Sequence, residues 1–181
     1  MPTIISHPAI PLAIGLGLSS GVVSRRLLVA GIVGSIAPDL DVYLHHAFDA
    51  YTALEHRGLT HSIFFALLCG AAAAAFAGKL HTRPVVAFFF VSVATASHGF
   101  LDAFTNGGPA ILFFWPFSDD RHFMPLQFIQ VSPLGIRPFF SLNGAHVLWS
   151  ELKWLWLPSI VLGIVVHWLR SAALAVHSPT R

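Results

Sequence analysis

Residues 62–78 read SIFFALLCGAAAAAFAG, an apolar stretch without a single charged side chain. Such a stretch favours a helix in lipid, because a bilayer core accepts roughly 20 apolar residues in a row. Further apolar runs lie at 8–23, 27–37, 84–104 and 152–169. The first two are short and favour a tight helical hairpin. The sequence therefore predicts an all-α, polytopic membrane bundle of about five main helices, forming one domain over residues 1–181.

The composition also indicates a membrane protein. Of the 181 residues, 55% are hydrophobic and 10% are charged, and the mean hydropathy is +0.72, whereas soluble domains are about 25% charged. The single cysteine, Cys69, excludes an internal disulfide and a cysteine-based zinc site. The pI near 9.1 comes without any basic cluster larger than Arg25-Arg26. We therefore expect no nucleic-acid partner.

The charges divide between the two ends of the predicted bundle. One end has six basic residues and no carboxylate: Arg25, Arg26, Lys79, Arg83, Arg170 and Arg181. The other end has the loops at 38–61, with a short helix expected near 42–54, and at 105–150, together with all eight acidic residues. Basic loops tend to stay in the cytoplasm. The sequence thus predicts a multi-pass inner-membrane protein whose acidic end faces the periplasm.

Histidines and aspartates converge on the acidic end. The motif His56-Arg57-Gly58-Leu59-Thr60-His61-Ser62 stands directly before the 62–78 helix, and Thr60 or Ser62 could cap that helix. His98 and Asp102, four residues apart, share one helix face. Six residues at this end are candidate metal ligands: His7, Asp39, Asp41, His61, His98 and Asp102. The topology follows from apolar runs and not from these residues, so their convergence predicts a shared metal site.

The donor types indicate the metal and the chemistry. Imidazole and carboxylate ligands without thiolate suit zinc, with manganese or iron as alternatives. Six ligands exceed the need of one ion, so we expect two divalent ions, which could clamp the oxygens of a phosphoester. The candidate catalytic acids and bases are His56, Asp41 and His122. Arg57 and Arg121 are candidates for binding substrate phosphate oxygens. Taken singly, each residue also has a plainer interpretation, as a helix cap, an interfacial carboxylate or a solvated arginine.

Several motifs resemble the YdjM-like family of membrane-bound metal-dependent hydrolases, also described as LexA-regulated inner-membrane hydrolases. The motifs are Ser6-His7, Pro38-Asp39-Leu40-Asp41, the 56–62 motif, Ser97-His98-Gly99-Phe100-Leu101-Asp102, Thr105-Asn106-Gly107-Gly108 and Phe114-Trp115-Pro116-Phe117. The resemblance covers most of residues 6–140. It implies metal roles for Asp39 or Asp41, His61, His98 and Asp102, with His7 as an early ligand.

That family is similar, more distantly, to zinc-dependent phospholipase C and the S1/P1 nucleases, all-helical enzymes that hold three zinc ions and hydrolyse phosphoesters. Those enzymes carry a His-xxx-Glu motif on a later helix. Here His146 and Glu151 are five residues apart, which departs from the one-face spacing. The resemblance therefore implies two ions more strongly than three.

We expect a metal-dependent hydrolase that cleaves a phosphoester in a lipid or lipid-linked substrate. The aromatic-rich segment 105–150, expected to be irregular, would lie over the site and hold the apolar part of that substrate. One alternative is a metal or proton transporter that uses the same cluster, although residues 62–97 offer little polarity beyond Ser92, Thr95 and Ser97. A second alternative is a non-catalytic scaffold stapled by metal.

Overall fold

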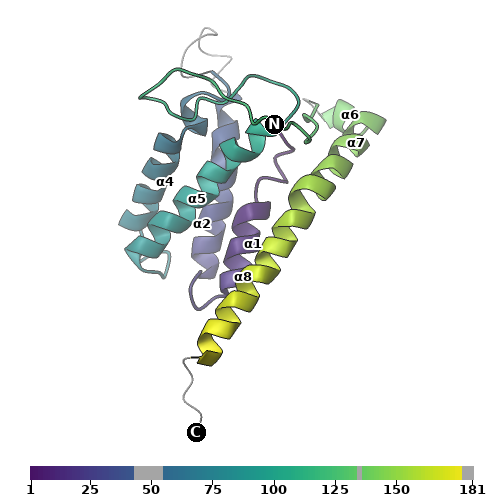
Figure 1. Ribbon diagram of the computed structural model, residues 1–181. Helices are drawn as coiled ribbons and strands as arrows, with labels where there is room; N and C mark the ends of the chain where they lie inside the picture. Colours follow the sequence, from purple (N-terminus) through teal and green to yellow (C-terminus); the bar gives the residue numbers. More distant parts are fainter. Residues whose placement is uncertain (43–54, 134–135, 177–181) are drawn as a thin grey trace.

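The computed structural model describes residues 1–42, 55–133 and 136–176, and these residues form helices and loops without a strand (Figure 1). The body of the bundle consists of α1 (Ala9–Leu18), α2 (Arg25–Ile36), α4 (Ile63–Ala75) and α5 (Pro84–Ala103). Two short 3-10 turns, η1 (Ala37–Leu40) and η2 (Leu59–His61), lead out of α2 and into α4. The C-terminal part contains α6 (Ile136–Phe139), α7 (Leu142–Glu151), the π-helical turn η3 (Leu152–Trp156) and α8 (Leu157–Val176). The last three run on as one long helix.

The predicted helical bundle is confirmed, but several helix ends differ from the prediction. The first helix ends at Leu18, and the second begins at Arg25 because the Ser24 hydroxyl caps it by accepting from Leu27 N–H. Of the two candidate caps for α4, Ser62 takes this role and accepts from Phe65 N–H. Pro84 occupies the first turn of α5, where its missing N–H is tolerated.

The expectation of an irregular chain from 105 to 150 is wrong for its last part. Residues 142–151 are helical and extend the final helix well before the predicted start at 152. Asn143 and Gly144, both weak helix formers, obscured this helix in the sequence. The short helix expected near 42–54 falls almost entirely outside the described residues.

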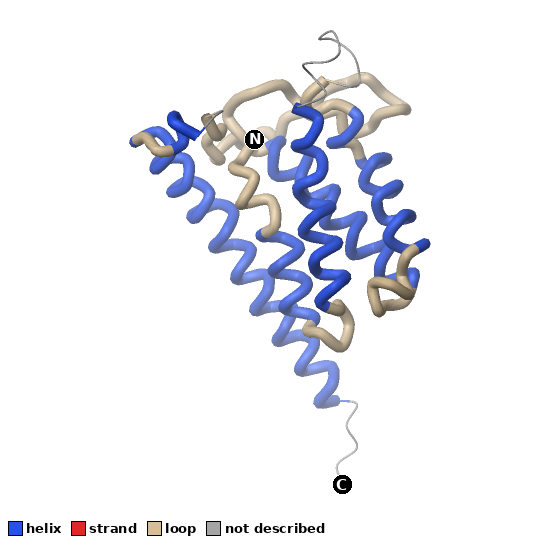
Figure 2. Tube along the Cα trace, turned by 180° about the vertical axis from the view of Figure 1, so that it is seen from behind, coloured by secondary structure: helices blue, strands red, loops and turns tan. Residues whose placement is uncertain are grey.

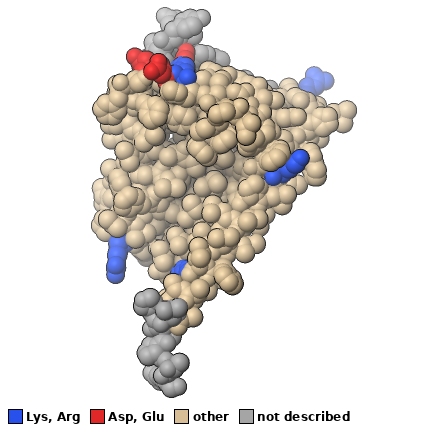
Figure 3. Space-filling model, in the orientation of Figure 1, with Lys and Arg blue, Asp and Glu red and all other residues tan. Residues whose placement is uncertain are grey.

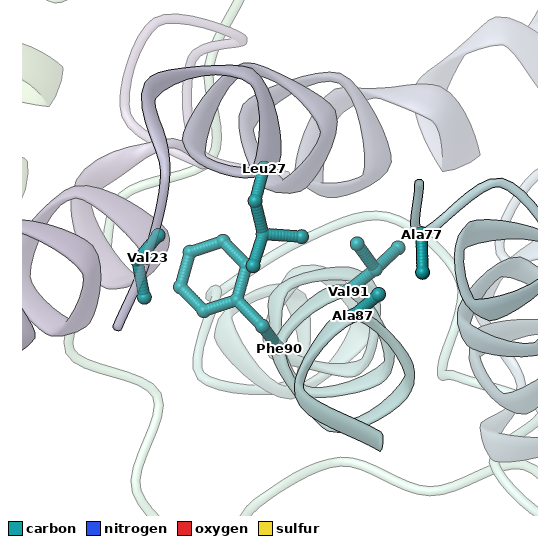
Figure 4. Close-up of a cluster of buried hydrophobic side chains, with 6 residues drawn as sticks. All are labelled: Val23, Leu27, Ala77, Ala87, Phe90 and Val91. Carbon is teal, nitrogen blue, oxygen red and sulfur yellow. The ribbon is translucent and has the colours of Figure 1, made fainter. Parts of the chain in front are cut away.

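The helices pack through close approaches at small residues. Helix α5 lies at the centre, with α4 and α2 against it, while α1 packs against α8. A Cβ added at Gly70 would lie 2.0 Å from Ser92 Oγ and 2.6 Å from the backbone oxygen of Phe88, so α4 and α5 nearly touch. Gly17 brings α1 equally close to the backbone of Gly163 in α8. An apolar core between α2 and α5 contains Val23, Leu27, Ala77, Ala87, Phe90 and Val91 (Figure 4).

The two ends of the bundle differ in character. The N-terminus lies beside the loop that follows α5 at one end of the bundle, and the last turn of α8 lies at the other, in both Figure 1 and Figure 2. The face seen in Figure 3 has acidic side chains only near the loop end and long stretches without any charge. Helix α5 and the continuous helix Leu142–Ala175 are long and apolar enough to cross a membrane. The described part of the chain therefore has the form expected of a membrane protein.

The loop that follows α5 folds back over the loop end of the bundle. Its backbone pairs with itself where Ile111 and His122 form an isolated bridge. It is fixed to the 55–63 region by Leu112 N–H, which donates to Arg57 O, and by Ile63 N–H, which donates to Phe113 O. The loop therefore forms a roof over the ends of η1, η2 and α5.

Candidate metal centre

Five polar side chains from four parts of the chain meet beneath this roof. They are His7 before α1, Asp39 in η1, His61 in η2, and His98 and Asp102 one turn apart in α5. Each is at most 5% exposed. The structure thus brings together five of the six predicted ligands in one buried cluster, which we call the donor ring.

The two carboxylates of the donor ring each face two histidines. Asp39 places Oδ2 3.6 Å from His7 Nε2 and Oδ1 3.3 Å from His98 Nε2. Asp102 places Oδ1 3.7 Å from His7 Nε2 and Oδ2 3.6 Å from His61 Nε2. The ring closes where His61 Nε2 and His98 Nε2 lie 3.1 Å apart. The N–O distances exceed an ordinary hydrogen bond and approach the roughly 3.3 Å that separates ligands of a tetrahedral zinc ion.

Three side chains of the donor ring, those of His7, Asp39 and Asp102, make no hydrogen bond. Both carboxylate oxygens of Asp39, both of Asp102 and both ring nitrogens of His7 are buried without a hydrogen-bond partner. Asp102 Oδ2 has one ion-pair partner, Arg57 Nε at 3.1 Å, whereas only histidines face Asp39. Burying a charge without enough partners is costly, and proteins tolerate it where a cation completes the site. The cluster Asp39, His61, His98 and Asp102 offers donor atoms within 4.8 Å of one another. This cluster could hold a metal ion.

The outer nitrogens of two ring histidines are held by acceptors. His98 Nδ1 lies 2.7 Å from the backbone oxygen of Ser35, an acceptor only, so this nitrogen carries the proton. His61 Nδ1 lies 3.2 Å from Asp41 Oδ2. Metal-binding histidines commonly donate their second N–H to a carboxylate or a backbone carbonyl, which orients the ring toward the metal. Both histidines have this arrangement, and both point Nε2 into the donor ring.

Asp41 occupies a different place from Asp39. Its Oδ1 lies 2.7 Å from His56 Nδ1, and its Oδ2 accepts from Thr60 Oγ1 at 2.6 Å and from Arg57 N–H at 3.2 Å. Burial would raise its pKa, but the hydrogen bonds from His56, His61 and Thr60 hold the pKa well below the usual range. The carboxylate is therefore ionised with both oxygens engaged. We assign Asp41 to orienting His61 and His56, and Asp39 to the donor ring.

The surroundings of His7 and His61 shift their pKa values in opposite directions. Burial, together with the neighbouring His98, lowers the pKa of His7 to about 3. Burial also acts to lower the pKa of His61, but its interactions with Asp102 and Asp41 outweigh burial and raise the pKa to about 9. At neutral pH His7 therefore offers a free lone pair, whereas His61 retains a proton until a metal ion displaces it.

His56 connects the buried cluster to the surface. Its side chain is 21% exposed, while its partner Asp41 is 2% exposed. Its ring lies edge-on to His61 at 5.4 Å. Asp41, His56 and His61 form a second group of donor atoms within 4.8 Å of one another. The predicted catalytic pair His56 and Asp41 therefore stands next to the donor ring, with His56 on its accessible side.

Arg57 was a candidate phosphate ligand, but the structure gives its guanidinium other partners. The side chain is fully buried. Nη1 donates to the backbone oxygens of Gly107 and Pro109, Nη2 donates to Thr105 Oγ1, and Nε lies 3.1 Å from Asp102 Oδ2. Gly108, at φ +81°, packs against the guanidinium, where a Cβ would lie 3.1 Å from it. Arg57 thus fixes the roof loop and orients Asp102.

Arg121 and His122 lie in the roof loop outside the donor ring. Arg121 is partly exposed and pairs with Glu55, next to His56, while also donating to the backbone oxygen of Ala110. His122 is exposed, and its ring lies edge-on to Phe114. Arg121 thus contacts the residue that precedes His56 in the sequence. His122 lies in the roof loop. Neither contributes a described contact to the five donors.

Two groups that hold the centre together are not predicted from the sequence: the backbone oxygen of Ser35 and the hydroxyl of Thr60. Thr60 had a visible signal, since it lies inside the 56–62 motif. A backbone acceptor such as Ser35 O cannot be predicted from the residue type, because every residue has a backbone oxygen.

Known proteins resemble this chain over nearly its whole length. The family model described as YdjM inner membrane protein matches residues 1–174. Inner membrane protein YbcI of Escherichia coli (strain K12) is 41% identical over 177 residues, which cover 94% of this chain and 99% of that protein. No solved structure matches the chain significantly.

Proposed function

The chain belongs to the YdjM inner membrane protein family, and from that premise we propose that it is a membrane-bound metal-dependent hydrolase of phosphoesters in lipid or lipid-linked substrates. One observation carries the proposal. A ring of buried donors, in which His7, Asp39 and Asp102 make no hydrogen bond, lies directly beside a histidine–aspartate pair, His56–Asp41, that reaches the surface. A binding site for metal and a group that can move protons are thus adjacent.

The donor ring has enough donor atoms that it could hold two ions. His7, with Asp39 Oδ2 and Asp102 Oδ1, offers one set of donors. His61 and His98, with Asp39 Oδ1 and Asp102 Oδ2, offer a second set. Nitrogen and oxygen donors suit zinc first, with manganese or iron as alternatives. Glu151 supports no third ion, because its carboxylate accepts hydrogen bonds from Thr3 and Ser6.

A bound divalent ion supplies a positive centre that polarises a phosphoryl oxygen and makes water more acidic. Side chains of the protein would transfer the protons. Asp41 Oδ1 accepts from His56 Nδ1 and so leaves His56 Nε2 free to take a proton from water and to return it to the leaving oxygen. Arg121, held beside His56 by Glu55, can attract the phosphate group.

The placement of the site suits a lipid headgroup. The centre lies at the loop end of the bundle, which we propose faces the periplasm because the opposite end carries Arg25, Arg26, Lys79 and Arg170. The roof loop exposes Phe114, Phe117 and Phe123. Aromatic side chains favour the level of the headgroups, so these side chains can hold the roof against the bilayer while a substrate diffuses to His56.

Two contacts favour a hydrolase over a transporter. A path for ions through the bundle would need polar groups open to one another along α5. The hydroxyls of Ser92 and Thr95 instead fill helix contacts, facing Gly70 and Gly34 respectively. The partial exposure of His56 likewise favours catalysis over a closed, purely structural metal staple.

The test is an activity assay on the purified full chain loaded with zinc. Vesicles containing phospholipids and isoprenyl phosphates serve as substrates, and release of a phosphorylated or dephosphorylated product is measured. We expect turnover that His56→Ala lowers by about 10²–10⁴-fold while bound zinc stays unchanged. Zinc uptake without turnover on any phosphoester would contradict the proposed reaction, and absence of zinc uptake would contradict the metal centre itself.

A further inference from the structure

A second buried polar cluster lies where the long C-terminal helix meets the N-terminal segment. The carboxylate of Glu151, 1% exposed, ends α7. It accepts from Thr3 N–H, from Thr3 Oγ1 at 2.6 Å and from Ser6 Oγ at 2.7 Å. Trp156 Nε1 donates to the same Ser6 hydroxyl at 2.9 Å. A buried hydrogen-bonded network thus joins the N-terminal segment to the long C-terminal helix.

The π-helical turn explains why Glu151 and Trp156 reach the same hydroxyl. Residues five apart on an α-helix lie about 140° apart around its axis. Between them the helix changes to η3, where Leu157 N–H donates to Leu152 O, five residues earlier. This wider turn brings residues five apart nearly above one another. The irregular turn therefore directs Glu151 and Trp156 to one face, toward Ser6.

The network stands one residue away from the donor ring. Ser6 immediately precedes His7, and Pro8 immediately follows it. His7 stacks on His98 with ring centroids 3.7 Å apart and faces Asp39 and Asp102. Leu155, one turn beyond Glu151, packs with Ala9 in an apolar cluster beside the network. The position of His7 is therefore set from both sides, by Ser6 and by the start of α1.

We propose that Glu151 is a positioning residue of the metal centre, which holds Thr3 and Ser6 and thereby sets His7 against Asp39 and Asp102. This inference rests on the proposed function for its effect on metal binding. Glu151 acts through hydrogen bonds and not as a ligand. Its role should therefore survive loss of its charge, provided that the hydrogen bonds can still form.

The experiment compares Glu151→Ala, Glu151→Gln and a matched control, Ser150→Ala, in the full chain. Ser150 is the neighbouring buried polar residue of α7, but its hydroxyl bonds to Gln130 N–H and Val147 O and not to the N-terminal segment. Hydrogen exchange of the N-terminal peptide is measured on chelator-treated protein. Zinc affinity is measured by competition with a chromophoric chelator.

We expect Glu151→Ala to speed exchange in the N-terminal peptide at least tenfold and to weaken zinc binding by about tenfold. Glu151→Gln should retain most of the exchange protection and most of the zinc affinity. Its amide can accept from Thr3 N–H and donate to the hydroxyl oxygens of Thr3 and Ser6. Ser150→Ala should change neither. Adding Glu151→Ala to His7→Ala should weaken zinc binding no further than His7→Ala alone, because both changes remove the same donor.

The outcomes separate this inference from the proposed function. If Glu151→Ala leaves exchange unchanged, or speeds exchange without weakening zinc binding, the positioning role is wrong. If Glu151→Gln loses zinc as fully as Glu151→Ala while the N-terminal peptide stays protected, Glu151 is a ligand and the inference is also wrong. If the wild-type chain binds no zinc, the proposed function is wrong. Hydrogen exchange of the Glu151→Ala variant then still shows whether Glu151 holds the N-terminal segment in place. Trp156→Phe, which removes one donor only, gives a milder version of the test should Glu151→Ala fail to fold.

Discussion

His61 and His98 direct their Nε2 atoms at each other across 3.1 Å. Ser35 O fixes the proton of His98 on Nδ1, and Asp41 faces Nδ1 of His61. If both imidazoles were neutral, the lone pairs of the two Nε2 atoms would face and repel each other. The contact is favourable only with a cation between the two nitrogens, either a proton or a metal ion. The same pair therefore links metal binding to proton release.

Asp39 and Asp41, two residues apart, should respond differently to loss of charge. Asp39→Asn removes a bridging donor, so we expect the amount of bound zinc to fall even at saturating metal. Asp41→Asn removes a partner that orients His61, so we expect about 10–100-fold weaker binding with full occupancy at high zinc. Metal analysis after equilibrium dialysis over a range of zinc concentrations measures both. Equal behaviour of the two variants would contradict the division of roles.

The stability of the metal-free protein should depend on His61. Its pKa in the folded protein, about 9, lies above its ordinary value of 6.5. The stabilisation from protonated His61 is therefore complete below pH 6.5 and lost as pH rises through about 9. We expect the unfolding temperature of chelator-treated protein to fall across this range, and His61→Gln to flatten the decline. Zinc binding at pH 7 should release a proton, which calorimetry in buffers of different ionisation enthalpy detects.

Arg57 should matter for stability more than for substrate. Arg57→Ala removes the ion pair with Asp102 and leaves the oxygens of Gly107 and Pro109 without their donors, and breaking such a buried pair costs about 3–5 kcal/mol. Arg121→Ala removes a partly exposed pair with Glu55 and should cost less than about 1 kcal/mol. Denaturant unfolding in mixed micelles compares the two. A stable Arg57→Ala variant with weakened substrate binding would restore the role predicted from the sequence.

The contact of α4 with α5 should tolerate no added side chain at Gly70. Gly70→Val places carbon atoms against the backbone oxygen of Phe88, and such overpacking costs about 1–3 kcal/mol. Gly78 offers the control, because a Cβ there meets nothing within 4 Å. Gly78→Ala should change stability by no more than about 0.5 kcal/mol. Thermal unfolding of both variants checks the expectation.

The orientation of the bundle can be read by labelling in intact cells. In a Cys69→Ser background, Asp119→Cys places a thiol in the exposed roof loop and Lys79→Cys places one in the opposite turn. A maleimide that does not cross membranes should label position 119 in intact cells, and position 79 only after lysis. The reverse pattern would put the donor ring in the cytoplasm.

Much of the fold and of the donor ring could be predicted, because both depend on residue type and spacing. Apolar runs located α4 and α5, and His98 with Asp102 share a face by helical geometry alone. The division between Asp39 and Asp41 could not be predicted, since it depends on which carboxylate Thr60 and His56 reach. The partners of Arg57 could not be predicted for a similar reason: two of them are backbone oxygens of the roof loop, which residue types do not reveal.

Glu151 and the helix at 142–151 were missed together. The π-turn after Glu151 rotates every later side chain around the helix axis. The period of a regular α-helix therefore does not predict that Glu151 and Trp156 lie on the same face. A pattern read at 3.6 residues per turn cannot place these two side chains on one face. The π-turn instead directs both side chains toward Ser6 in the N-terminal segment.

The unequal lengths of the helices set how the protein meets its bilayer. The thirteen residues of α4 rise about 20 Å, against a hydrocarbon core of roughly 30 Å, while the 34 residues of the helix Leu142–Ala175 rise about 51 Å. We therefore expect hydrophobic mismatch of opposite sign at α4 and at the long helix, with thinner lipid beside α4 and a tilted long helix. Thinning on the α4 side draws headgroups toward the level of η2. We expect the bilayer itself to bring its headgroups close to His56 and His61.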